Sequence, residues 1–219
     1  YSESIIMNTL IKQRLDDAAQ VIEALHEATD DIAMITSVII DRISTGGTIM
    51  AAGNGGSAAQ AMHFCEELTG RFRDTRPALP AICLCSDAAA MTCIANDFGW
   101  ENVFMRQVEA HASFTIDDEE ENAICNDVLF VLSTSGNSEN VNVALKCANE
   151  LGIVTIGLLG NDGGGSADLC DHCIVIDAPD SAAIQDGHQV VIHAICEIIE
   201  AWVAEEMAEE SEEEASEQE

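Results

Sequence analysis

The sequence has 219 residues, enough for one domain of ordinary size with a substantial core. Hydrophobic residues make up 47% of it, but no run approaches the ~20 apolar residues of a membrane helix and no export signal is recognisable, so a cytoplasmic protein without membrane association is expected. Forty acidic residues against eight basic ones give a formal net charge of −32, which argues against nucleic acid as a partner.

Two amphipathic helices are predicted first, over residues 4–25 and 30–43, and are expected to form a helical hairpin. Five short, continuously apolar strands separated by helices follow, which indicates a parallel sheet covered on both faces. A long final helix is expected from about residue 183 to 207. The sequence thus predicts a three-layer αβα sandwich with flavodoxin-like winding and five strands, at 48–52, 81–85, 128–132, 154–159 and 173–176.

The length predicts one domain over residues 1–207, and the run of acidic residues at the end predicts a disordered tail over 208–219. A second acidic segment, 117–121, is interpreted as a solvated loop that resembles an insertion. Nine cysteines, an odd number dispersed through apolar segments, predict reduced thiols. Cys170 and Cys173 form a C-x-x-C pair, for which core packing is preferred over a metal or redox role.

Two loops rich in Gly, Ser and Asn follow corresponding strands, at 53–57 and 133–138. In each, a strand leads into the loop and the loop into a helix, so backbone N–H groups and the helix N-terminus can cradle an anion. Ser57 is expected to cap the first of these helices. A plain Ser-rich cap without a ligand is the alternative for either loop, but two loops at corresponding places favour phosphate binding.

Candidate metal ligands lie on two helices. His63 and Glu67 are four residues apart, which places them on one helical face at a spacing common among metal ligands. A surface His–Glu contact explains the spacing equally well. Gln185 and His193 on the last helix are eight apart, roughly 12 Å along a straight helix, so both reach one ion only if Gly187 bends the helix or neighbouring subunits share the site.

These segments together resemble the sugar isomerase (SIS) domain family, and within it the sedoheptulose 7-phosphate isomerases, also called phosphoheptose isomerases. The resemblance rests on AAGNGGSAAQAMHFCEELTGRF (51–72), RPALPAICLCSD (76–87), IANDFGWENVF (94–104), LSTSGNSENV (132–141) and residues 185–193. It implies a homotetramer, with residues 1–45 in oligomerisation, that converts D-sedoheptulose 7-phosphate to D-glycero-D-manno-heptose 7-phosphate for the heptose of the bacterial surface.

The same resemblance implies roles for individual residues. One Zn²⁺ per subunit would be bound by His63, Glu67, Gln185 and His193, and Glu67 and His193 would be the catalytic base and acid of an enediol mechanism. Arg71 is a hypothesis for phosphate neutralisation or for positioning Glu67. The implied substrate and phosphate contacts are Asn54, Gly55, Gly56, Ser57, Glu67, Arg71, Asn96, Asp97, Ser133, Thr134, Ser135, Ser138 and Gln185.

The sequence departs from the family at three positions. Ala183 stands where an Arg is usual, Asp186 where Glu is usual, and Gln60 where some members have an acid. The rival interpretation is a non-catalytic SIS protein of the type that binds the bacterial replication initiator; that branch typically has Asn where His193 stands. An arabinose phosphate isomerase is a weaker third interpretation, because such chains usually carry regulatory domains.

Overall fold

The computed structural model describes residues 2–117 and 122–217, with side chains over 4–115 and 124–209. Its centre is a five-stranded parallel sheet in the order β2-β1-β5-β6-β7. This is the predicted flavodoxin-like winding, and the predicted strands are confirmed to within about two residues at each end. The strands are β1 Ile49–Gly53, β2 Ala81–Cys83, β5 Val128–Ser133, β6 Val154–Gly160 and β7 His172–Ile176.

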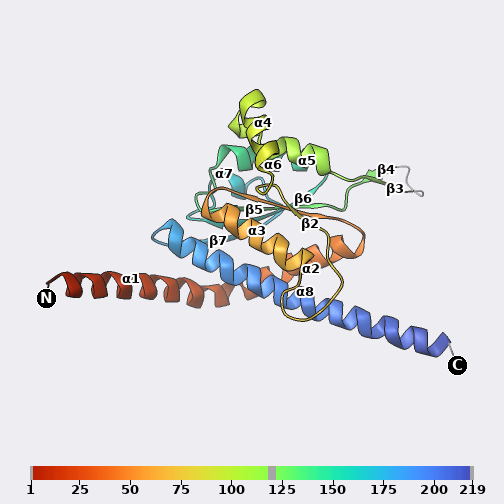
Figure 1. Ribbon diagram of the computed structural model, residues 1–219, viewed down its shortest axis with the longest axis horizontal. Coiled ribbons are helices and arrows are strands. Elements are labelled where there is room, and N and C mark those ends of the chain that lie inside the picture. Colours follow the sequence, from red (N-terminus) through yellow and green to blue (C-terminus); the bar gives the residue numbers. More distant parts are fainter. Residues whose placement is uncertain (1, 118–121, 218–219) are drawn as a thin grey trace.

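Helices cover both faces of the sheet, as Figure 1 shows. One face carries α2 (Thr29–Ser44), α3 (Gly56–Thr69) and α8 (Ser181–Glu217), together with the end of α1 (Ser2–Ala24). The other face carries the remaining main helices. These are α4 Ala88–Phe98, η2 Trp100–Asn102, α5 Met105–His111 and α6 Glu139–Glu150, with the short α7 Gly164–Ala167 beside them.

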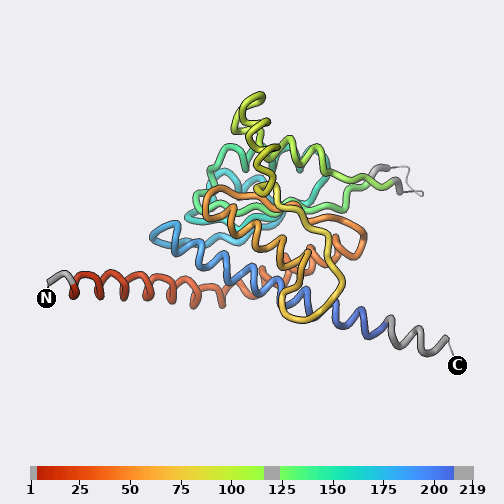
Figure 2. Tube along the Cα trace, viewed as in Figure 1, coloured from red at the N-terminus to blue at the C-terminus, as the bar shows by residue number. Residues whose placement is uncertain are grey.

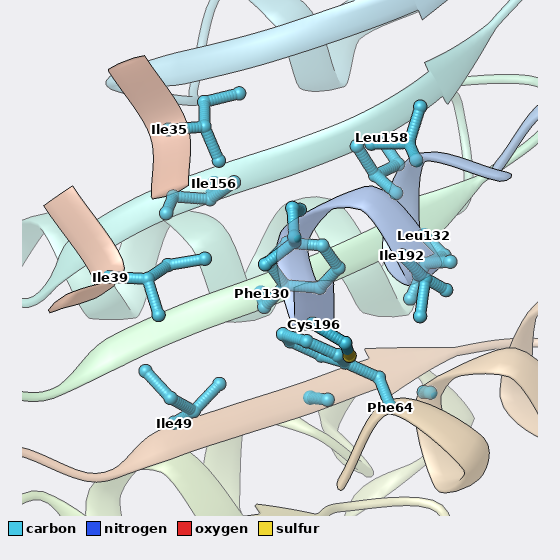
Figure 3. Close-up of a cluster of buried hydrophobic side chains, with 14 of the residues drawn as sticks. Ile35, Ile39, Ile49, Phe64, Phe130, Leu132, Ile156, Leu158, Ile192 and Cys196 are labelled. Atoms are coloured by element: carbon cyan, nitrogen blue, oxygen red, sulfur yellow. The ribbon is translucent and has the colours of Figure 1, made fainter. Parts of the chain in front are cut away.

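Alternate residues of each central strand enter opposite cores. In β5, Phe130 and Leu132 join the core under α3 and α8, whereas Leu129 and Val131 join the core under α6. Figure 3 shows the first of these cores, where Phe64 of α3 meets Phe130 with ring centroids 4.7 Å apart. Continuously apolar strands are therefore required, because both faces are buried.

The two N-terminal helices are present, but they do not form the predicted hairpin. A single 3-10 turn, η1 (Leu25–Ala28), joins α1 to α2, and within the described residues both helices pack on α8 rather than along each other. Figure 2 shows α1 projecting from one side of the sandwich and α8 from the other. The helical periodicity predicts each helix but not the angle between them, which their contacts with α8 determine.

Two segments lie outside the main sheet. Strands β3 (Thr115–Asp117) and β4 (Asn122–Ile124) form an antiparallel pair around the acidic segment, whose residues 118–121 fall outside the described part. Helix α8 extends to Glu217, and since its side chains are described only to residue 209, the disordered tail from residue 208 stays a prediction. No membrane-spanning segment is present among the helices that the structure describes.

All nine cysteines are free thiols, as predicted. Five of them are buried, at positions 65, 83, 125, 147 and 196. Burial raises the pKa of the Cys170 thiol to about 12, which keeps it protonated and unreactive at neutral pH.

Candidate active site

The two Gly/Ser-rich loops lie side by side at the carboxyl edge of the sheet. Strands β1 and β5 are parallel neighbours, with Gly53 in register with Leu132, so the loops that follow them leave the sheet together. The chain winds outward from β1 to β2 and then returns to β5, which makes this the point where the winding reverses. Ligands of open α/β sheets bind at such a point.

The first loop consists of Asn54 and Gly55 and leads directly into α3. Gly55 has φ of +58°, which favours glycine, and it occupies the N-cap position without a side-chain capping bond. The prediction that Ser57 caps this helix is therefore wrong: Ser57 is buried inside the first turn, and its backbone N–H donates to the Asn54 carbonyl oxygen. A Cβ on Gly56 would lie 2.6 Å from the Gln185 Nε2, so the Gln185 amide packs directly on this glycine.

The second loop joins β5 to α6 and holds its shape through its own hydroxyls. Ser133 Oγ accepts a hydrogen bond from the Gly136 N–H at 3.1 Å and lies 3.4 Å from Ser138 Oγ. Ser135 is exposed, and its Oγ accepts from the Asn137 N–H. Thr134 is half-buried and gives its backbone oxygen to the Asn161 side chain. The four predicted phosphate contacts thus line one compact turn.

A third loop, after β6, supports the second and was not recognised in the sequence. The Ser166 N–H donates to the Gly136 carbonyl oxygen at 2.8 Å, and the Gly165 N–H donates to Asn137 Oδ1 at 3.0 Å. A Cβ on Gly136 would lie 1.9 Å from the Gly163 carbonyl oxygen, so the two backbones meet directly. The run Gly163-Gly164-Gly165 is the signal that could have indicated this close approach.

A pair of amides connects the first loop to the second half of the site. Asn54 Nδ2 donates to Asn140 Oδ1, and Asn140 Nδ2 donates back to Asn54 Oδ1, both at 2.9 Å. Asn140 is buried at the start of α6, with only 2% of its surface exposed. Sequence reasoning missed Asn140, because only the fold brings position 140 beside position 54.

Three titratable side chains from α3 and α8 converge. His63 Nε2 lies 3.3 Å from Glu67 Oε1 and 3.2 Å from His193 Nε2. One nitrogen or oxygen of each residue falls within 4.8 Å of the other two. We call these residues the His63–Glu67–His193 cluster, in which the i, i+4 pair of α3 and the histidine of α8 lie together.

The donor set of this cluster suits a zinc ion. Two imidazole nitrogens and a carboxylate oxygen are typical zinc ligands, and three protein ligands leave a position open for a substrate. Among the described residues it is the one such group of histidine, cysteine and acidic side chains. The cluster is also accessible: His193 is exposed, and His63 is half-buried.

Within one chain, Gln185 lies away from the His63–Glu67–His193 cluster. Its amide packs on Gly56 at the first loop, and His63 lies seven residues further along α3, roughly 10 Å along the helix axis. Helix α8 runs unbroken through Gly187, where a Cβ would lie 2.6 Å from Ile176 Cδ1. Gly187 therefore allows close packing rather than the bend considered from the sequence.

Arginine side chains fix the segment after α3. Arg76 donates from Nη2 to the Glu67 carbonyl oxygen at 2.6 Å and from Nη1 to the Leu68 carbonyl oxygen at 3.0 Å, and its side chain is 4% exposed. Arg76 thereby binds carbonyl oxygens of the last turn of α3 and positions Glu67, which is the role that the sequence suggested for Arg71. Arg71 is exposed, with Nη1 3.3 Å from Thr75 Oγ1, and remains available to an anion.

The other predicted residues are less closely connected. Asn96 and Asp97 are exposed on α4, where the Asn96 amide donates to Asp97 Oδ1 at 2.6 Å. Figure 1 shows α4 on the opposite face of the sheet from α3 and α8, so α4 does not bring this pair to the cluster. Ala183, in place of the usual Arg, is fully buried in the core. Asp186 forms an ion pair with Arg14 of α1.

His188 is a core histidine rather than a ligand. It is fully buried, and its Nε2 lies 3.1 Å from the Leu159 carbonyl oxygen. Because a carbonyl can only accept, His188 Nε2 carries the proton. Burial lowers the pKa of His188 to about 4, so the ring is neutral at physiological pH.

Comparisons with known proteins show the family of the chain. Residues 14–160 match the family model described as the SIS domain. The chain is 42% identical over 195 residues to a phosphoheptose isomerase of Geobacter metallireducens, covering 89% of this chain and 97% of that protein. It is 43% identical over 196 residues to a phosphoheptose isomerase of Aliarcobacter butzleri, covering 88% and 96%.

Solved structures give the same result. The structure of phosphoheptose isomerase GmhA from Neisseria gonorrhoeae superposes with a TM-score of 0.79 at 32% identity, covering 89% of this chain and 99% of that one. A phosphoheptose isomerase from Francisella tularensis gives a TM-score of 0.77 at 29% identity, covering 91% and 98%. The chain therefore belongs to the SIS domain family and, within it, to the phosphoheptose isomerases, a family of phosphosugar isomerases.

Proposed function

We propose that this chain converts D-sedoheptulose 7-phosphate to D-glycero-D-manno-heptose 7-phosphate beside one zinc ion per subunit. The observation that carries the proposal is the convergence of His63, Glu67 and His193 in a chain whose two anion-cradling loops share one edge of the sheet. The names of its relatives supply the sugar, since nothing in the loops distinguishes a heptose from another phosphosugar.

The phosphate would be bound by the second loop and the N-terminus of α6. Exposed Ser135, the hydroxyls of Ser133 and Ser138, and the positive end of the α6 dipole suit a phosphate dianion. Asn54, Gly55 and Gly56 would hold the sugar hydroxyls next to it. In a chain with a formal charge of −32, these neutral donors and Arg71 provide the local attraction that the net charge does not.

The isomerisation moves one proton between adjacent carbons and one between adjacent oxygens. Glu67 would take the proton from carbon 1 of the ketose, giving an enediol, and return it to carbon 2. His193 would transfer the proton between the two oxygens. A bound zinc ion would supply Lewis acidity that stabilises negative charge on the sugar oxygens. Because the Glu67 side chain is only 12% exposed, the carboxylate is shielded from water where it would act.

His63, Glu67 and His193 are the proposed ligands within one chain. Gln185, the fourth ligand that the family resemblance implies, packs on the first loop, so it would serve the sugar in its own subunit or reach the ion of a neighbouring copy. A homotetramer is proposed, and exposed apolar side chains on α1 support association: Ile5, Leu10 and Leu15 are 63%, 66% and 64% exposed. Asn96 and Asp97 are likewise proposed to contact substrate.

The test is incubation of the purified chain with sedoheptulose 7-phosphate and zinc, followed by chromatographic separation of the two isomers. Native protein is expected to convert the substrate, and Glu67→Gln and His193→Ala are each expected to abolish conversion while circular dichroism stays native. Binding of zinc and phosphosugar without conversion would favour the initiator-binding type of SIS protein instead. Full activity in both variants would refute the mechanism.

A further inference from the structure

Two glutamine side chains form a relay that ends on His193. Gln60 is buried, 8% exposed, one turn before His63 on α3. Its Nε2 lies 2.8 Å from the Gln185 backbone oxygen and 3.4 Å from Gln189 Oε1. Gln189 Nε2 in turn lies 2.9 Å from His193 Nε2, and the family resemblance assigned no role to Gln189.

The direction of every bond in this relay follows from its first member. The Gln185 backbone oxygen can only accept, so the atom of Gln60 that faces it is the NH2 group. The same NH2 group faces Gln189, so it meets the oxygen of that amide and turns the other end, the NH2 group, toward His193. An NH2 group can only donate, which leaves His193 Nε2 as an acceptor.

We infer that Gln189, oriented by Gln60, is a positioning residue that holds neutral His193 as the Nδ1–H tautomer, with the Nε2 lone pair directed into the His63–Glu67–His193 cluster. A free neutral imidazole populates both tautomers, and only the one with an unprotonated Nε2 can use that atom as a ligand or as a base. The geometry of the cluster places this atom 3.2 Å from His63 Nε2.

One departure from the family pattern lies in this relay. Gln60 replaces an acid that some members have, and an amide at this position both donates to the Gln185 oxygen and fixes the orientation of Gln189. A carboxylate in its place would accept only, and could not hold the Gln189 oxygen toward itself. The relay therefore depends on amides at both positions.

The significance for catalysis rests on the proposed function, but the tautomer can be measured without metal or substrate. The full chain is labelled with ¹⁵N-histidine and treated with a chelator at about pH 8.5, two units above the ordinary histidine pKa. Long-range ¹H–¹⁵N correlation spectra then distinguish a protonated from an unprotonated ring nitrogen. His188 is the internal reference, since its Nε2 carries the proton in every folded variant.

Native protein is expected to show His193 with Nε2 unprotonated. Gln189→Leu should give a mixture of tautomers, and Gln189→Glu, which can only accept, should favour Nε2–H. Gln60→Leu frees the Gln189 amide to rotate and should also give a mixture. Gln13→Leu, the same change at an exposed position on α1, should alter nothing.

Two results would overturn the inference: a protonated Nε2 in native His193, or an unchanged tautomer in both Gln189 variants while His188 keeps its reference pattern. The experiment is then repeated with zinc. If the ion shifts His63 and His193 together, the proposed metal site is supported whatever the tautomer result. If zinc moves neither, the metal site fails, and the measurement on the chelator-treated chain still decides the role of Gln189.

Discussion

The reciprocal Asn54–Asn140 pair gives a quantitative test of how the two halves of the site are joined. Each amide donates to and accepts from the other at 2.9 Å, and Asn140 Oδ1 also accepts from the Val141 N–H at 3.0 Å. A buried hydrogen bond contributes about 1 kcal/mol net, so the pair should couple by about 1–2 kcal/mol. Asn140→Ala alone should destabilise the fold by about 2 kcal/mol, since it also strands the Val141 N–H.

The assay is a double-mutant cycle by urea unfolding, with Asn54→Ala, Asn140→Ala and the combined variant at one protomer concentration. Because either change releases the first loop, all three variants should also show a raised KM for the phosphosugar. Asn102→Ala, which removes an exposed amide on η2, is the control and should change stability by less than about 0.5 kcal/mol. Single effects that add to within about 0.3 kcal/mol would refute the coupling.

Three further predictions concern stability and assembly. The unfolded chain protonates His188 below pH 6.5, but the native chain protonates it only near its pKa of about 4, so stability is lost as the pH falls between these values. His188→Leu should reduce the change of the unfolding free energy with pH in this window by up to ~1.4 kcal/mol per pH unit, as measured by urea titrations at several pH values. Leu10→Glu with Leu15→Glu should reduce the proposed tetramer to smaller species in sedimentation velocity, and an unchanged assembly would remove α1 from the proposed interface. Gly187→Ala should lower the thermal midpoint, because the new Cβ overlaps side chains of β7 and α1 at a cost of ~1–3 kcal/mol; a gain of about 1 kcal/mol from helix propensity alone would contradict the packing argument.

Periodicity predicted the fold because each strand carries its own signal. Continuous apolar runs such as Val128–Leu132 are required where both faces of a strand are buried, and the Gly/Ser runs that follow β1 and β5 mark the places where the chain turns into a helix. The prediction that α1 and α2 form a hairpin was wrong, because the sequence of the two helices does not carry a signal for their arrangement. The angle between two amphipathic helices depends on what their apolar faces cover, and here that is α8.

The site was predictable where a motif is local and not where the fold assembles it. His63 and Glu67 share one helical face, so their spacing carries the information. Gln189 lies one turn before His193 and was overlooked for Gln185, because its importance depends on Gln60 from another helix. Arg76 was overlooked for Arg71, since only the folded loop after α3 returns its guanidinium to the Glu67 carbonyl.

The central claim is that the Glu67 carboxylate moves a carbon-bound proton where two imidazoles converge with it. Isomerisation in D2O measures this directly, because an enediol route through an exchanging carboxylate incorporates deuterium at carbon 2 of the product. Native protein with zinc is expected to incorporate deuterium, and Glu67→Gln is expected to slow incorporation by at least about a hundredfold while phosphosugar binding is retained. Incorporation at the native rate in Glu67→Gln would contradict the account.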